Sequence, residues 1–320
     1  MLPARLLVWA IAYGSYAYDR NYSMSLQKAL KRSSLLVNAV HAFRSIKHKW
    51  QVGGFGWVRT DNEIVERLNT YSPASGGSLH AQSGVALQSA QQAFPLLCSV
   101  IETISRSLLA PRSIEDIFGP QANSNDMIQL ASLFDHYGSD KSNHHNYHLL
   151  YGGLLGPKRS SQLRILEIGL GTNNPDILSN MGPGGKPGAS LRAFRDFCPN
   201  AELIGADIDH RILFEEERIH TYYVDQTQPD SLDLLYSKLS DRPFDLIIDD
   251  GLHSPNANIA TMILALRSLR SHGVFIVEDI PLRSIPIWQV VAALLPHAYH
   301  PTIVQAKNAC LFMIQKPGSE

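Results

Sequence analysis

Beyond about residue 120, short apolar runs alternate with longer stretches in which apolar residues recur at helical spacing. This alternation is typical of βαβ units, and we predict an α/β protein with a Rossmann-like, doubly wound, mostly parallel sheet. In such sheets ligands bind at the carboxyl ends of the strands, so functional residues are expected just after each run. The predicted strands are Leu163–Ile168, Glu202–Asp207, Thr221–Val224, Phe244–Ile248 and Val274–Val277, with Ile303–Val304 and Cys310–Ile314 as closing strands. The predicted helices are Ser190–Phe197, Ser231–Leu239 and Asn256–Leu269.

The first 120 residues lack this alternation, and we predict a helical N-terminal extension of unknown role. Helical spacing marks Ser25–Trp50, whereas residues 72–84, rich in Ser and Gly, predict a linker. A short helix is predicted over Asp61–Leu68 with Asp61 as its cap, and another over residues 86–109, which Pro95 should kink or restart. We therefore divide the chain into the helical region (1–120), a lead-in segment (121–160) and the α/β domain (161–320).

An apolar stretch near the start of the sequence is too short to cross a membrane. Leu6–Tyr18 is apolar over 13 residues, whereas a transmembrane helix needs about 20. Arg5 before it leaves a signal peptide open, but tyrosines crowd the potential cleavage site near Ala17, and a packed helix is favoured. The three cysteines lie far apart without a CxxC pair, which favours a reducing compartment, and we predict a cytoplasmic protein.

Charge is distributed unevenly along the chain. Residues 1–60 carry nine Lys and Arg against one acid, a balance of +8, and the remaining 260 residues carry 19 basic and 28 acidic side chains, a balance of −9. The basic leader leaves open a peripheral contact with a membrane surface or with an acidic partner. A nucleic-acid partner is not expected, because the sequence has no interleaved aromatic platform and no Asn-Pro-Pro-Tyr motif.

Two glycines follow the first predicted strand, in Glu167-Ile-Gly169-Leu-Gly171. Glycine lets the backbone turn tightly and approach a ligand closely. A dinucleotide-binding turn would read G-x-G-x-x-G/A, and the missing third glycine argues against an NAD-dependent oxidoreductase. Glu167 before the turn suits a cationic ligand better than a pyrophosphate.

Polar residues also follow the next two predicted strands. Asp207 ends the second strand, at the position where an acid of a nucleotide-binding α/β fold accepts hydrogen bonds from ribose hydroxyls. Asp225 and Gln226 follow the third strand. A helix-capping or turn role for Asp225 is left open.

The fourth and fifth predicted strands end in Asp249-Asp250-Gly-Leu-His253 and in Glu278-Asp279. Adjacent parallel strands would bring Asp250, Glu278 and Asp279 to one rim, where carboxylates repel one another unless a cation joins them. Oxygen ligands favour Mg²⁺ over zinc, so these three acids predict a magnesium site. His253 follows closely enough to act as a base toward a metal-bound hydroxyl. Helix capping by one or two of the acids is the alternative.

Taken together, residues from about 130 to 316 resemble a branch of the class I S-adenosylmethionine (SAM) methyltransferases. This branch is that of the metal-dependent sugar O-methyltransferases of macrolide biosynthesis, of the mycinamicin type. Besides the strand-end motifs, the resemblance rests on Tyr137-Gly-Ser-Asp-Lys141, on Tyr147 and Tyr151, and on Gly188-Ala-Ser-Leu-Arg192. It implies transfer of a methyl group from SAM to a hydroxyl of a sugar, or of another small or polysaccharide-linked acceptor, with Mg²⁺.

The resemblance also implies a role for each matching residue. His253 would be the catalytic base, and Asp250, Glu278 and Asp279 would hold Mg²⁺. Lys141, in the lead-in segment, is expected at the charged methionine end of SAM, with a surface salt bridge as the alternative. The other cofactor-binding residues would be Glu167 near the methionine portion, Gly169, Gly171, Asp207 at the ribose, Asp225 or Gln226 at the adenine, and Asp249.

Some features stay open at this point. The Gly/Pro-rich segment Asn173–Gly188 is either a lid over the site or an excursion of the chain. A homo-oligomer is also open. The alternative function is a noncatalytic SAM- or nucleotide-binding module whose basic N-terminal region binds a membrane or a partner.

Overall fold

The computed structural model describes residues 56–74, 77–104, 107–119 and 125–318. The apolar stretch Leu6–Tyr18, the predicted helix Ser25–Trp50 and most of the basic leader lie outside these residues. The chain divides into two compact units, Met1–Gln92 and Ala93–Glu320. Within the described residues, no helix combines the length and the apolar character needed to span a lipid bilayer.

The first unit contains α4 (Gly56–Arg67) and the start of α5 (Leu79–Thr103), which continues into the second unit. Asp61 lies inside α4, so the prediction that it caps the helix is wrong. Its carboxylate instead lies 2.6 Å from the Ser83 hydroxyl and 3.1 Å from the His80 ring, which ties α4 to α5. The predicted restart at Pro95 is also wrong, because α5 continues through this residue. The surrounding turn is largely exposed, so water can satisfy the carbonyl that loses its partner.

One sheet organises the second unit, and its strand order is β1-β8-β9-β7-β6-β2-β3-β5-β4 among the described residues. All neighbouring strands are parallel except where β9 meets β7 and β8 and where β4 meets β5. The predicted doubly wound, mostly parallel sheet is therefore confirmed. The predicted strands are β2 (Arg164–Ile168), β3 (Glu202–Asp207), β5 (Ile219–Tyr223), β6 (Phe244–Asp249), β7 (Leu269–Ile280), β8 (Thr302–Gln305) and β9 (Cys310–Gln315).

Two short edge strands were not predicted. β1 (Pro111–Ser113) pairs in parallel with β8, and β4 (Glu215–Glu216) pairs antiparallel with β5. The first lies within the region predicted to be helical, so the sheet includes residues before 120. Strands of two or three residues carry too little periodicity to be recognised in a sequence.

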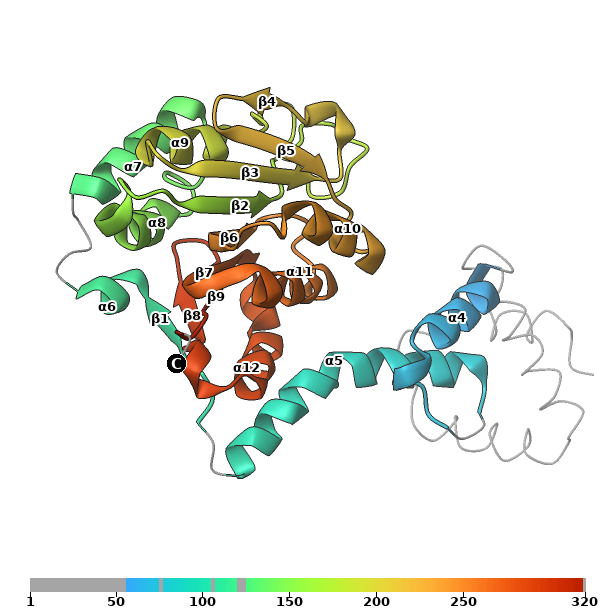
Figure 1. The fold of residues 1–320 in the computed structure, drawn as a ribbon. Helices are drawn as coiled ribbons and strands as arrows, with labels where there is room; N and C mark the ends of the chain where they lie inside the picture. Colours follow the sequence, from blue (N-terminus) through green and yellow to red (C-terminus); the bar gives the residue numbers. More distant parts are fainter. Residues whose placement is uncertain (1–55, 75–76, 105–106, 120–124, 319–320) are drawn as a thin grey trace, which may run out of the picture. The chain divides into compact units, whose positions relative to one another are not determined.

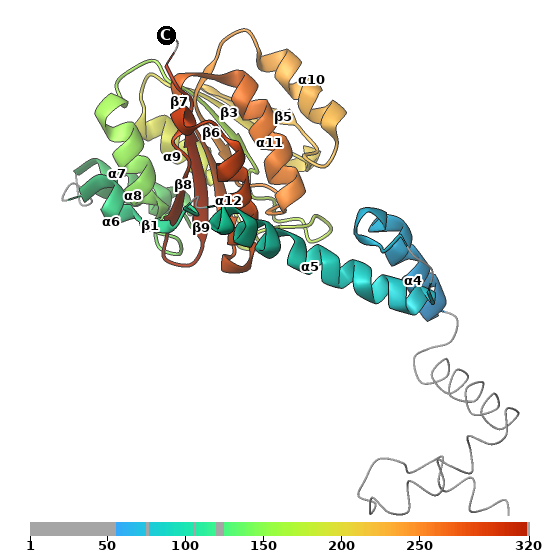
Figure 2. The ribbon, with the colours of Figure 1, turned by 90° about the horizontal axis from the view of Figure 1, so that it is seen from below.

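Helices cover both faces of the sheet (Figures 1 and 2). One face carries α7 (Asn125–Tyr137), α8 (Tyr147–Leu155) and α9 (Ala189–Phe197), and the other carries α10 (Pro229–Leu239), α11 (Pro255–Ser268) and α12 (Ile285–Leu294). A short helix, α6 (Ile114–Phe118), follows β1.

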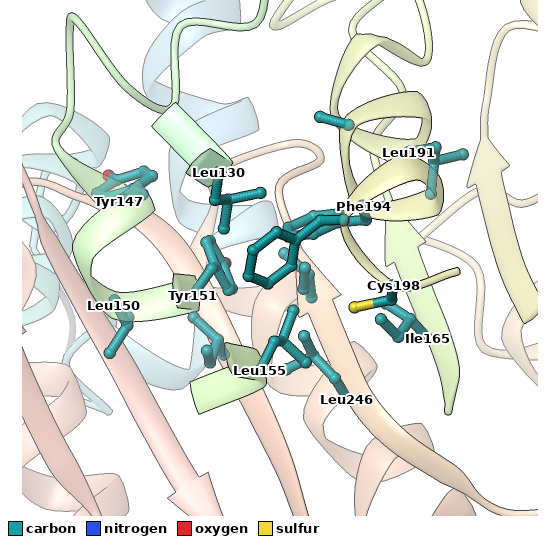
Figure 3. Packing of buried hydrophobic residues seen from close by; sticks show 14 of the residues in the cluster. Leu130, Tyr147, Leu150, Tyr151, Leu155, Ile165, Leu191, Phe194, Cys198 and Leu246 are labelled. Carbon is teal, nitrogen blue, oxygen red and sulfur yellow. The ribbon is translucent and has the colours of Figure 1, made fainter. Parts of the chain in front are cut away.

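The inner strands, such as β2, β3, β6 and β7, contribute to two hydrophobic cores, because successive side chains point to opposite faces. Ile165 of β2 packs in the core with Tyr151 and Phe194 (Figure 3), whereas the next residue, Leu166, packs in the core of the other face. Burial on both faces explains why the strands read as continuous apolar runs. The three cysteines are buried in the second unit and form no disulfide.

Candidate functional site

A cavity of about 390 Å³ lies at the carboxyl ends of the strands. It is lined by the loops after β2, β3, β5 and β6 and by Asp279 near the end of β7, around the point where the strand order reverses between β6, β2 and β3. This is where open α/β sheets bind their ligands. Of the predicted site residues, those that line the cavity are Gly169, Gly171, Asp207, Asp225, Gln226, Asp250, His253 and Asp279.

The turn after β2 depends on glycine. Gly169 has φ +96°, and a Cβ there would collide with the backbone carbonyl of Asp250. Gly171 has φ +77°, and a Cβ there would collide with the sulfur of Met181. Glycine alone adopts such dihedrals readily and leaves the space free. The turn can therefore pack directly against the loop after β6.

Asp207 is fixed at the end of β3 by backbone donors. Its two oxygens accept hydrogen bonds from the amides of Leu170 (2.7 Å) and Asp209 (2.8 Å). Burial raises the pKa of Asp207, although these amides oppose the shift. Each carboxylate oxygen has a second lone pair, so Asp207 can still accept hydrogen bonds from a ligand diol.

The segment Asn173–Gly188 borders the cavity through residues that include Leu178 and Met181. It is fastened beside Asp209, which accepts hydrogen bonds of 2.6 Å from Thr172 and Asn174. Arg211 also donates to Asp209 at 2.6 Å and pairs with Asp176 of the segment at 3.1 Å. These contacts lower the pKa of Asp209, chiefly through Arg211. The segment is therefore a wall of the cavity and not an excursion away from it.

Gln226 and Asp249 form a buried network beside the cavity. The Gln226 amide nitrogen donates to Asp249 (2.7 Å) and to the Thr261 hydroxyl (2.8 Å), and its oxygen accepts from the backbone amide of Leu252 (2.9 Å). Asp249 is fully buried and does not line the cavity. Asp249 is therefore one residue removed from the cavity, behind Gln226.

Asp250, His253 and Asp279 lie close together in the lining of the cavity. One side-chain ligand atom from each lies within 4.8 Å of the other two, a grouping that could hold a metal ion. His253 Nε2 lies 3.8 Å from Asp279 Oδ2, and His253 Nδ1 is buried without a hydrogen-bond partner among the described residues. Two carboxylates and an imidazole with an unused nitrogen form a donor set that fits a divalent cation.

Asp279 is held by neighbours from the lead-in segment. The Tyr147 hydroxyl donates to its Oδ1 at 2.5 Å, and the His145 ring lies 3.6 Å from the same oxygen. Burial alone would raise the pKa of Asp279, but the Tyr147 hydrogen bond and the nearby His145 and His253 lower it. Asp279 is therefore kept ionised in the lining of the cavity.

The remaining predicted residues, Lys141, Glu167 and Glu278, are buried and do not line the cavity. Lys141 Nζ lies 2.7 Å from Asp250 Oδ2, 2.5 Å from Glu278 Oε2 and 3.5 Å from Glu167 Oε1. Burial opposes the charge of Lys141, but the three carboxylates raise its pKa well above the ordinary value. The sequence predicted that Lys141 contacts the methionine end of SAM or forms a salt bridge at the surface. The structure instead places it among three carboxylates in the interior of the protein.

Glu278 and Glu167 have further partners within the fold. Glu278 accepts a hydrogen bond from the Tyr151 hydroxyl, so both of its oxygens are engaged. The Ser190 hydroxyl donates to Glu167 at 2.6 Å. Burial raises the pKa of Glu167 to about 7, against the opposing effect of Lys141. Ser190, Tyr147 and Tyr151 had no predicted role, although all three lie in the motifs that carry the resemblance. Thr172, Asn174 and Arg211 gave no signal in the sequence.

Comparison with known proteins gives sequence relatives that are named O-methyltransferases. No family model matches the chain. It is 31% identical over 169 residues to the 8-demethyl-8-alpha-L-rhamnosyl tetracenomycin-C 2'-O-methyltransferase of Streptomyces olivaceus, covering 52% of this chain and 42% of the relative. It is 35% identical over 123 residues to the mycinamicin VI 2''-O-methyltransferase of Micromonospora griseorubida, covering 38% of this chain and 28% of the relative.

A solved methyltransferase of the mycinamycin biosynthetic pathway, in complex with Mg and SAH, is similar to this chain with a TM-score of 0.48. The two are 23% identical, and the similarity covers 62% of this chain and 57% of that one. The two sequence relatives confirm the resemblance to the sugar O-methyltransferases that the motifs indicated. The match spans less than half the length of either curated relative named above.

Proposed function

We propose that the protein is a SAM-dependent O-methyltransferase that modifies a sugar hydroxyl of a glycosylated small molecule with the help of a divalent cation. The observation that carries the proposal is the grouping of Asp250, His253 and Asp279 in the lining of the cavity. The similarity to methyltransferases named for rhamnosylated and macrolide substrates supports the acceptor class. These three residues lie where an acceptor would meet a cofactor bound along the strand ends.

The residues around the cavity have complementary tasks in this proposal. SAM carries an activated methyl group, so the protein mainly supplies position and charge. Gly169 and Gly171 let the cofactor approach the backbone, and Asp207 accepts hydrogen bonds from its ribose. Asp225 borders the cavity beside Gln226 and is proposed for the adenine.

Asp250 and Asp279 are proposed to hold the divalent ion, which when bound would lower the pKa of the acceptor hydroxyl. Ligation by Glu278 stays a prediction, since both of its oxygens have partners in the structure. His253 is proposed to accept the hydroxyl proton at Nε2, and Asp279 then stabilises the imidazolium.

The test is transfer of radiolabelled methyl from SAM to 8-demethyl-8-alpha-L-rhamnosyl tetracenomycin C, with and without EDTA. His253→Asn should lower turnover by roughly 10²–10⁴-fold, and Asn tolerates the positive φ of 54° found at this position. His220→Asn, on an exposed histidine of β5, is the control and should keep full activity.

Full turnover in EDTA would remove the metal from the proposal. SAM binding without transfer to any glycosylated acceptor would favour the noncatalytic module. A homo-oligomer, a membrane contact of the basic leader and a cytoplasmic location stay predictions.

A further inference from the structure

Lys141 divides the acidic residues of the site into two layers. The inner carboxylates, Glu167 and Glu278, have side chains that are 0% and 1% exposed, and Lys141 is 2% exposed. The outer side chains, Asp279 and His253, are 28% and 29% exposed. Asp250, at 23%, belongs to both layers, because its Oδ2 lies 2.7 Å from Lys141 while the residue also lines the cavity.

The inner layer would be unstable without its lysine. Two fully buried carboxylates and one oxygen of Asp250 surround a single ammonium group. Buried carboxylates without a counter-charge carry a large desolvation cost. Of these three acids, only Asp250 lines the cavity, so an ion in the cavity has direct access to the outer layer alone.

We propose that Lys141 is the permanent counter-cation of this cluster, which neutralises the inner layer so that the protein folds without metal and takes a single divalent ion at Asp250 and Asp279, beside His253. The lysine thereby also weakens the attraction of the site for a cation. The proposal rests on the proposed function only where it assigns a divalent ion to the outer layer. The role of Lys141 in the inner layer is argued from its own contacts with the three carboxylates.

The first test is metal-free stability. Lys141→Met keeps most of the length of the side chain and removes its charge, so its melting temperature in EDTA should fall well below that of the wild type. Addition of millimolar Mn²⁺ should restore much of the loss in Lys141→Met and shift the wild type less. Lys238→Met, the same change at an exposed position of α10, should match the wild type in both conditions.

The second test asks whether removing one buried carboxylate restores stability once the lysine charge is gone. In EDTA, the double variant Lys141→Met/Glu278→Gln should be more stable than Lys141→Met alone, because one uncompensated carboxylate has been removed. If Lys141 contributed only by filling space, adding Glu278→Gln to Lys141→Met would not raise the stability. This arm needs no metal, so it decides the role of Lys141 even if the proposed metal site fails.

The third test is Mn²⁺ affinity, measured by electron paramagnetic resonance. Removal of a positive charge beside the ion should tighten binding by about ten-fold or more in Lys141→Met, with one ion per chain in both proteins. Lys141→Arg, which keeps the charge, should stay within about three-fold of the wild type. Equal affinity in the wild type and Lys141→Met would overturn the electrostatic part of the proposal. Absence of Mn²⁺ binding in every variant would instead count against the metal in the proposed function.

Discussion

The side-chain oxygen of Gln226 accepts a hydrogen bond of 2.9 Å from the backbone amide of Leu252. This contact joins the loop after β5, which borders the proposed cofactor position, to the loop after β6, which carries Asp250 and His253. A Cβ at Gly251 would collide with the same oxygen, so the two loops fit only with glycine at that place. The proposed cofactor-binding and catalytic loops are therefore one packed unit.

Replacement of Gln226 by Leu should disturb both loops. Asp249 would lose the amide donor and the amide of Leu252 would lose its acceptor, which should cost about 1–3 kcal/mol of unfolding free energy for each stranded group. Urea denaturation measures the loss, and turnover should fall because His253 follows Leu252 directly. Gln228→Leu, at an exposed position of the same loop, is the control. Unchanged stability in Gln226→Leu would show that the network contributes nothing.

Tyr147 should matter for metal affinity although it is not a proposed ligand. Its hydroxyl orients Asp279 and keeps it ionised, and loss of such a supporting contact typically lowers metal affinity 10- to 100-fold. Tyr147→Phe should therefore weaken Mn²⁺ binding by about ten-fold. Tyr137→Phe removes a hydroxyl that bonds Asp196 outside the site and should leave the affinity unchanged. Equal affinities in the two variants would contradict the role assigned to Tyr147.

Gly169 should be far less tolerant than a glycine with similar dihedrals elsewhere. Gly169→Ala places a methyl group on the Asp250 carbonyl and should cost about 3 kcal/mol or more, together with SAM binding. Gly182 also has a positive φ, of 72°, but nothing lies within 4 Å of a Cβ there, so Gly182→Ala should cost only about 1 kcal/mol. Thermal denaturation and SAM titration measure both effects, and similar losses in the two variants would contradict the collision.

Glu167 should make the protein less stable as pH rises. Its pKa is about 7 in the folded state against 4.5 for a free side chain, so between these values the folded state holds a proton that the unfolded state has released. The unfolding free energy should therefore fall from about pH 4.5 to pH 7, by about 3 kcal/mol from this group. Glu167→Gln should flatten this part of the stability profile, whereas Glu217→Gln, at an exposed position, should not. Parallel profiles for wild type and Glu167→Gln would refute the assignment.

The sheet could be predicted from the sequence because its strands are buried on both faces and therefore read as apolar runs. Their parallel order also predicted that Asp250, Glu278 and Asp279 would meet at one rim, and of these Asp250 and Asp279 line the cavity whereas Glu278 is buried beside Lys141. What the sequence did not indicate is which polar group pairs with which. Lys141 could have met a ligand or a surface acid, and only the packing of α8 and its preceding loop on the sheet brings it against Glu278.

Helix boundaries in the first unit were harder to predict because they too depend on partners that are remote in the sequence. Asp61 has the residue type and the position of a helix cap, but its carboxylate binds Ser83, which is remote in the sequence. Tertiary partners of this kind override local preferences. The role of residues 1–55 lies outside what the structure describes.

All three cysteines are buried, so an introduced surface cysteine could be labelled selectively with a fluorescent dye. Burial raises the pKa of Cys98 and Cys310, and that of Cys198 to about 12, so native thiolate is scarce at neutral pH. Leu178, in contrast, is 80% exposed on the segment that borders the cavity. A cysteine introduced there would be the fastest to react with a maleimide dye, and the emission of the attached fluorophore would report whether ligand binding changes the surroundings of this segment.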